Sequence, residues 1–376
     1  MKFKSLEIIN SKDRISSVDI FRSIAIITVV LFHFNFSLPY GYLGVDLFFL
    51  ISGLLVGGML VRQLERNEPV HFGRFFLQRG FKIWPSYYVF LLLGNGIAWI
   101  LYHNTHPEQI IPLWDLKRYV FFYQNYTGKP FHWSFDHVWS LCVEEHFYIL
   151  LPLMFIVLQR FVALEHRKKM LLVFVILTIA AGMLFKYCSF FFTRSKDTYS
   201  ATHNRIDALA WGVLLHMAVT RYKDRLRSAT LQLPFFGLGV LLFVAALYTN
   251  INCGSVLFNR VYFHSIVPLC FFLMLLGLYY VDFSKWKALR FIAYYSYNWY
   301  LWHPLFVLFL TAQFGNTPIG LLCFISLTFL IAVIMTTAIE EPALRKRKAI
   351  LDKLSGKPDR VGTQSAETPD QKDLSN

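Results

Sequence analysis

Long apolar segments dominate the sequence, and short polar or charged breaks separate them. A hydrocarbon core about 30 Å thick requires roughly 20 apolar residues in each helical span. Segments of about that length cover residues 18–38, 43–61, 83–102, 138–158, 170–191, 204–220, 231–249, 263–281, 291–311 and 318–339. The pattern predicts an all-α, polytopic membrane helix bundle of about ten transmembrane helices.

The distribution of positive charge predicts the orientation of this bundle. Most of the 37 Lys and Arg residues fall in alternate connections, for example at 62–82 after the second segment and at 345–348 after the last. Cytoplasmic connections carry such an excess of Lys and Arg, so we expect both termini to be cytoplasmic. The formal net charge of +14 therefore reports topology and does not indicate nucleic-acid binding.

The same pattern divides the chain into three parts. Residues 1–17 are expected to form a cytoplasmic N-terminal segment, and residues 18–342 a single transmembrane domain. Residues 343–376 are polar and are expected to form a disordered cytoplasmic tail. The first apolar segment follows several basic residues, as a signal peptide would, but no small-residue cleavage site follows it. We therefore interpret it as a retained span.

Composition supports the membrane assignment and argues against a metal site. The chain is 56% apolar and has a mean hydropathy of +0.45, which exceeds what a soluble globule carries. Its five cysteines show neither a disulfide framework nor zinc spacing. The long connection 103–137 contains four histidines, but their spacing matches no standard metal site. These are His103, His106, His132 and His137.

Two ionisable residues, Arg22 and His33, lie inside the first apolar segment. Such groups cost several kcal/mol in a bilayer unless they are paired or face a watery cavity. Eleven residues make about three helical turns, so both side chains share one helix face about 16 Å apart. They indicate a functional face. In the alternative interpretation, Arg22 reaches the lipid headgroups and His33 forms an interhelical hydrogen bond.

Six short motifs occur in a characteristic order along the chain. They are Arg22 and His33 with ten residues between them, and residues 44–53, 138–148, 205–212, 300–304 and 341–342. In this combination the chain resembles the membrane acyltransferases of acyltransferase family three, which includes O-antigen, exopolysaccharide and Nod-factor O-acetyltransferases. The resemblance covers nearly all of residues 16–342. It implies an O-acetyltransferase that moves an acyl group from acetyl-CoA, or another acyl-CoA, to a hydroxyl of an extracytoplasmic glycan.

The resemblance also implies that His33 and Arg22 are catalytic. A histidine can take the hydroxyl proton as a general base, which we favour, or carry the acyl group as a transient acyl-imidazole. An arginine can stabilise the oxyanion that forms. Adjacent residues on a helix point about 100° apart, so only one of Glu144 and Glu145 should face a cavity. We expect Glu144 to orient His33; in the alternative interpretation it pairs with a structural arginine.

The basic connection 62–82 is the predicted donor site. Family members carry an Arg-x-x-Arg pair ahead of a proline, and here the pair is Arg79 and Lys82, before Pro85. Lysine retains the charge but lacks the planar fork that suits bidentate phosphate contacts. Coenzyme A presents phosphates from the cytoplasm, which a basic inner connection would attract. We therefore predict that Arg79 and Lys82 bind the donor; in the alternative interpretation they belong to an ordinary basic cytoplasmic loop.

Several other polar residues have structural interpretations. Asp19 lies three residues before Arg22 and is expected to be its ion-pair partner. No nucleophile elbow surrounds Ser52, so we expect it to form packing or hydrogen-bonding contacts. It precedes glycines 53, 57 and 58, which make a small-residue face for close helix contact. His303 is either functional or structural; in the structural interpretation it satisfies a carbonyl that the following proline frees.

Arg205 and Asp207 either line the acceptor side or form a plain interhelical pair.

The rival function is a glycan transporter or flippase, because buried Arg, His and Glu also build proton relays. Transporters commonly show two related halves with broken helices, and no such internal symmetry is visible in the sequence. The acyltransferase hypothesis predicts acyl-CoA, a glycan acceptor, the lipid bilayer and glycan-assembly enzymes as partners, in a bacterial inner membrane.

Overall fold

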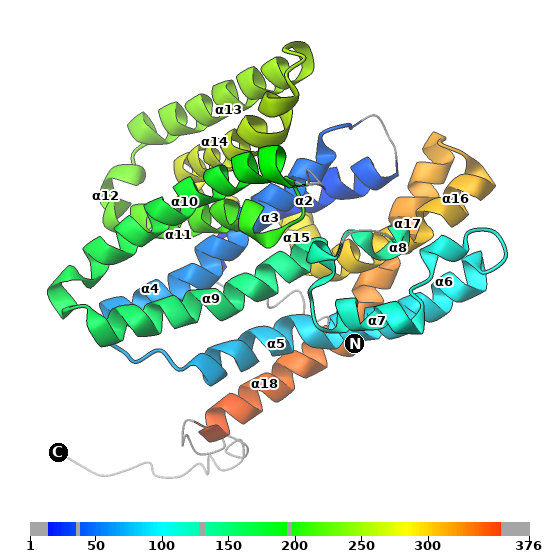
Figure 1. The fold of residues 1–376 in the computed structure, drawn as a ribbon, viewed down its shortest axis with the longest axis horizontal. Helices are drawn as coiled ribbons and strands as arrows, with labels where there is room; N and C mark the ends of the chain where they lie inside the picture. The colour runs from blue at the N-terminus through cyan, green and yellow to red at the C-terminus, as the bar shows by residue number, and fades with distance from the viewer. Residues whose placement is uncertain (1–13, 35–37, 128–131, 194–197, 355–376) are drawn as a thin grey trace, which may run out of the picture.

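The structure is a computed structural model that describes residues 14–34, 38–127, 132–193 and 198–354. Within these ranges the regular elements are all helical, which confirms the predicted all-α bundle (Figure 1). Helix α2 (Ser16–His33) packs against both α3 (Gly44–Ser52) and α15 (Lys287–Trp302). The helix that carries both ionisable residues of the first apolar segment is thus enclosed by two others.

The other elements follow α3 in chain order. The long helices are α5 (Phe72–Val89), α9 (Trp139–Phe161), α10 (Arg167–Phe192), α11 (Ile206–Arg221), α13 (Ala229–Asn252), α14 (Phe263–Leu278), α17 (Pro318–Met335) and α18 (Glu341–Leu354). The shorter helices are α4 (Gly58–Glu65), α6 (Asn95–Tyr102), α7 (Leu113–Val120), α8 (Trp133–Asp136), α12 (Lys223–Leu226) and α16 (Val307–Phe314). Wider π-helical turns join α3 to α4, α5 to α6 and α17 to α18.

Eight helical stretches in the described residues are long and apolar enough to cross a membrane. They are Ser16–His33, Gly41–Glu65, Phe72–Tyr102, Trp133–Phe161, Leu164–Phe192, Ala229–Asn252, Phe258–Leu278 and Pro318–Leu351. Their exposed apolar side chains suit contact with lipid; α13, for example, buries little of its surface against the rest of the protein. The polytopic architecture predicted from the apolar segments is confirmed.

Two of the ten predicted spans are not uninterrupted spanning helices. Segment 204–220 forms α11, whose 16 residues reach only about 24 Å, less than the hydrocarbon thickness. Segment 291–311 is divided between α15 and α16 by a 3₁₀ turn over His303–Phe306. Pro304 has no backbone N–H with which to continue the α-helix, so the chain breaks there. The break places His303 at a helix end inside the protein.

The first residues of the predicted disordered tail are helical. Residues 343–354 belong to α18, which packs against α5, and Arg347 donates a hydrogen bond to the Gln78 carbonyl at 3.3 Å. The basic residues at 345–348 lie on this helix, and contact with α5 explains why a polar sequence is helical here. Residues 355–376 and residues 1–13 of the predicted N-terminal segment lie outside the described residues.

Glycines allow α3 and α11 to approach closely. A side chain at Gly53 would collide with the Leu209 carbonyl, and one at Gly212 with the Leu50 carbonyl. Gly57 and Gly58 likewise lie against side chains of α11. The predicted small-residue face is therefore confirmed, with α11 as the helix that it contacts.

Buried ion pairs tie the same helices together. Asp46 on α3 pairs with Arg205 at the start of α11, and Lys186 on α10 pairs with Asp207. All four side chains are fully or almost fully buried. Arg205 and Asp207 therefore form interhelical ion pairs, one of the two interpretations that the sequence left open. Burying two charged groups costs desolvation free energy, so removing one partner leaves the other charge buried and uncompensated.

Asp19 is not the ion-pair partner of Arg22, contrary to the prediction. Its carboxylate accepts hydrogen bonds from the Arg14 guanidinium, with Nε 3.1 Å away, and from Arg290 Nε at 3.2 Å. The sequence interval suggested a contact within one helix, but Arg290 on α15 reaches the carboxylate from outside it. Arg22 is therefore not paired with Asp19.

Candidate active site

Two cavities meet the α2 face that carries Arg22 and His33. The larger, which we call the histidine cavity, has a volume of about 1410 Å³ and is lined by His33 and His137 together with aromatic side chains, among them Tyr42, Trp139 and Tyr199. The smaller, which we call the arginine cavity, has a volume of about 130 Å³. It is lined by Arg22, Ser52, Arg79, Lys82, Glu144 and Tyr148, among others.

His33 lies at the last turn of α2 and contacts a second histidine. Its Nδ1 is 2.9 Å from the Val29 carbonyl oxygen and 3.1 Å from Nε2 of His303. A carbonyl can only accept, so His33 Nδ1 carries the hydrogen when the ring is neutral. The remaining nitrogen, Nε2, then holds a lone pair, and none of the described residues hydrogen-bonds to it. His33 is therefore held in the tautomer that a general base requires.

His303 is oriented in the same way. Its Nδ1 donates to the Trp299 carbonyl at 2.9 Å, which leaves Nε2 as an acceptor facing His33. The His33 N–H is thus shared between a carbonyl of its own helix and the ring of His303. The sequence alone left the role of His303 open between structural and functional. The proline that follows it was the available signal, because it marks the helix break at which this ring lies.

His137 completes a cluster of three imidazoles. Its ring centroid lies 6.5 Å from that of His33 and 5.8 Å from that of His303. Its Nε2 is bonded to the Leu301 carbonyl at 3.1 Å, so that nitrogen is a donor. The sequence placed this residue among four loop histidines, and spacing alone could not associate it with α2. The described residues contain no group of His, Cys, Asp and Glu that could hold a metal ion.

Another loop histidine is structural. His132 binds the Glu108 carbonyl through Nδ1 and the Asp115 carboxylate through Nε2, at 3.1 and 2.9 Å. Arg118 also pairs with Asp115. Burial raises the pKa of Asp115, but the hydrogen bonds from Arg118 and His132 outweigh it, so its pKa lies below its ordinary value. This cluster fastens α7 to the segment that precedes it.

Glu144 lines the arginine cavity and does not contact His33. Its Oε2 accepts a hydrogen bond from the Tyr148 hydroxyl at 2.8 Å, and that hydroxyl lies 2.6 Å from Ser52 Oγ. The predicted orientation of His33 by Glu144 is therefore wrong in this structure, because His303 occupies the position beside Nδ1. Ser52 has the hydrogen-bonding role predicted for it. Glu144, rather than Glu145, is the member of the pair that lines a cavity.

The three basic residues of the arginine cavity differ in their partners. Lys82 forms an ion pair with Glu340. Arg79 lies 5.9 Å from the Tyr148 ring centroid, donates to the Met59 sulfur at 3.2 Å, and has a buried Nε without a partner. No described residue forms an ion pair with Arg22 or Arg79. The cavity therefore presents two guanidinium groups that can interact with an anion.

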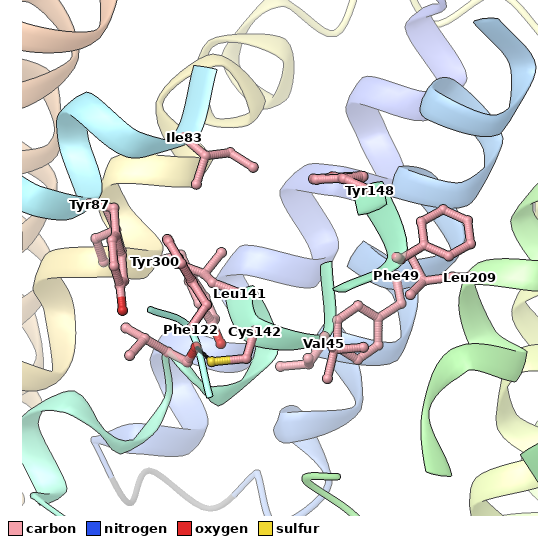
Figure 2. Close-up of a cluster of buried hydrophobic side chains, with 14 of the residues drawn as sticks. Val45, Phe49, Ile83, Tyr87, Phe122, Leu141, Cys142, Tyr148, Leu209 and Tyr300 are labelled. Atoms are coloured by element: carbon pink, nitrogen blue, oxygen red, sulfur yellow. Dashed lines mark hydrogen bonds between the residues drawn. The ribbon is translucent and has the colours of Figure 1, made fainter. Parts of the chain in front are cut away.

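Tyr300 and Val45 line both cavities, and no other described residue does. Figure 2 shows both side chains in the buried cluster that also contains Leu141 and Tyr148. The Tyr300 hydroxyl lies 2.7 Å from the His137 carbonyl oxygen and 2.7 Å from Ser140 Oγ. Tyr300 on α15 and Val45 on α3 thus form the boundary between the histidine and arginine cavities.

Two known proteins resemble this chain, one over most of its length and one over less than half. It is 25% identical to the O-acetyltransferase OatA of Staphylococcus aureus over 370 residues, which cover 92% of this chain and 59% of the relative. It is 29% identical over 163 residues to the peptidoglycan O-acetyltransferase OatA of Listeria monocytogenes, covering 40% of this chain and 26% of the relative. The chain thus spans less than two thirds of these relatives. No solved structure matches it.

The acyltransferase domain family matches residues 15–337. This range runs from the start of α2 into the π-helical turn before α18 and includes both cavities. The histidine cluster, the arginine cavity and their shared boundary all lie within it. The chain therefore belongs to the acyltransferase domain family, the family to which its sequence motifs pointed.

Proposed function

We propose that this protein is an integral-membrane O-acetyltransferase that moves an acetyl group from cytoplasmic acetyl-CoA to a hydroxyl of an extracytoplasmic glycan, such as a surface polysaccharide. Both termini and the arginine cavity face the cytoplasm in this proposal, and the histidine cavity faces the other side. The membrane is a bacterial inner membrane, and glycan-assembly enzymes supply the acceptor. Family membership and the O-acetyltransferase relatives support the reaction class.

The observation that carries the proposal is the hydrogen bonding of His33, which assigns its tautomer. The Nδ1–H of His33 is hydrogen-bonded to the Val29 carbonyl and to His303, which leaves the lone pair on Nε2. His33 lines the histidine cavity, which has a volume of about 1410 Å³. A base in such a cavity can take a proton from a bound hydroxyl. The aromatic residues Tyr42 and Trp139 on the cavity wall offer flat surfaces for a sugar ring.

The reaction then balances as an acyl transfer. Nε2 of His33 takes the acceptor proton while the acceptor oxygen attacks the thioester carbonyl. The carbon–sulfur bond breaks, and the proton passes from His33 to the departing thiolate, which leaves as free coenzyme A. While His33 is charged, its Nδ1–H points at the His303 lone pair, which stabilises the imidazolium.

The donor end of the proposal rests on the arginine cavity. Arg22 and Arg79 provide positive charge without an ion-pair partner among the described residues, and Lys82 adds a charge that Glu340 partly neutralises. Anionic groups of the donor would bind there. Arg22 lies about 16 Å along α2 from His33, so in this proposal it acts on the donor in the arginine cavity and not on the oxyanion beside His33. Glu144 holds Tyr148 on the wall of this cavity rather than acting on His33.

The proposal is tested by measuring alkali-labile acetate on surface glycan. Cells that lack the protein are complemented with wild type, with His33→Ala or with His103→Ala, at matched membrane levels. His103 makes the same hydrogen bond to a carbonyl one helical turn back, but it lies outside both cavities. Acetate should return with wild type and His103→Ala only. Restored export of an unmodified glycan, without acetate, would instead establish a flippase.

A further inference from the structure

The histidine and arginine cavities are separated by very little protein. They share Val45 and Tyr300, and both residues are only about 6% exposed. An acyl group that starts in the arginine cavity and reaches His33 has to pass this boundary. The inference that follows rests on the proposed function, because only a transferred group needs to cross.

Tyr300 is held at the boundary from several directions. Its hydroxyl contacts the His137 carbonyl and Ser140 Oγ, each at 2.7 Å. Its ring meets Phe48 edge-on at 6.1 Å between centroids, and it lies 6.0 Å from the ring of His303. A tyrosine anchored at its hydroxyl and enclosed along its ring has little freedom to turn aside. It therefore acts as a fixed wall rather than a mobile surface residue.

We propose that Val45 and Tyr300 form the passage between the donor and acceptor cavities and limit the size of the acyl group that is transferred. The arginine cavity, at about 130 Å³, leaves little room for a longer chain to fold back. Each additional methylene must therefore enter the space between Val45 and Tyr300. A single methylene changes discrimination by about 10- to 200-fold in an apolar pocket.

The test compares acetyl-CoA, propionyl-CoA and butyryl-CoA as donors. Purified full-length protein is reconstituted in phospholipid vesicles with a soluble N-acetylglucosamine oligomer as acceptor, and acylated product is measured by mass spectrometry. Wild type should transfer acetyl at least about tenfold faster than butyryl. Val45→Ala and Tyr300→Ala should each raise the butyryl-to-acetyl ratio by about tenfold or more. Tyr300→Phe keeps the ring and should keep the preference for acetyl.

A matched control separates widening of the passage from general loosening of the core. Val143 is a fully buried valine on α9 that lines neither cavity, so Val143→Ala should leave the ratio unchanged. Transfer of acetyl by wild type, with equal ratios in every variant, would overturn the size-limiting role. Loss of all transfer in folded Tyr300→Phe would also overturn it, because the hydroxyl would then act chemically. Absence of transfer by wild type itself would instead refute the proposed function.

Discussion

Replacing His303 with alanine is expected to slow acetyl transfer strongly while leaving donor affinity intact. The mutation removes the ring nitrogen that lies 3.1 Å from His33 Nδ1. A hydrogen bond to a charged group contributes about 1.5–3 kcal/mol. His33 is charged during the reaction and neutral before it, so this loss falls on the transition state. The free energy corresponds to a decrease in kcat of about 10- to 150-fold.

The assay measures kcat and KM with isotope-labelled acetyl-CoA in reconstituted vesicles. His303 does not line the arginine cavity, so KM for acetyl-CoA should remain within about twofold of wild type. His303→Gln places an amide oxygen near the lost acceptor and should recover part of the rate. His103→Ala is the control, because His103 hydrogen-bonds to the Trp99 carbonyl as His303 bonds to Trp299, without touching His33.

A kcat for His303→Ala within about twofold of wild type would refute the reasoning, because the Val29 carbonyl would then be a sufficient acceptor at Nδ1. An equal decrease in kcat for His303→Ala and His303→Gln, with both proteins folded, would instead show that the His303 imidazole must exchange a proton. A rise in KM with unchanged kcat would place His303 in donor binding. These outcomes are distinguished by measuring kcat and KM separately for each variant.

Three structural predictions accompany this one. Gly212→Ala should destabilise the protein by about 1–3 kcal/mol, seen as a lower unfolding midpoint in detergent, because a methyl group there collides with the Leu50 carbonyl. Asp46→Leu should lower the free energy of unfolding by about 3–5 kcal/mol, because it leaves Arg205 buried without its counter-ion. The double variant Asp46→Leu with Arg205→Met should restore most of the wild-type unfolding midpoint. Because the pKa of Asp115 is lowered, its ionised carboxylate stabilises the fold at pH values above the ordinary Asp pKa of about 4. This stabilisation is lost as the pH falls through the lowered pKa. Hydrogen exchange of α7 amides, corrected for intrinsic rates, should therefore accelerate at acidic pH in wild type, whereas Asp115→Asn should exchange faster already at neutral pH.

Much of the fold was determined by the sequence itself. Apolar length predicted an all-α membrane bundle, because backbone groups in lipid have to be satisfied within each helix. The interval between Arg22 and His33 placed both on one face of α2 because helical periodicity is a local property. The ordered motifs indicated the acyltransferase family, which the match over residues 15–337 confirms. Each of these features depends on neighbouring residues or on the order of segments.

Tertiary structure alone decided which side chains meet. The partner of His33 is His303, 270 residues away, and not Glu144, because α15 packs along α2 and brings the two rings together. Asp19 likewise pairs with Arg290 across helices. Segment lengths could not reveal this, since helices that are distant in sequence become neighbours only by packing. The boundary between the two cavities is likewise a product of that packing, and no local pattern encodes it.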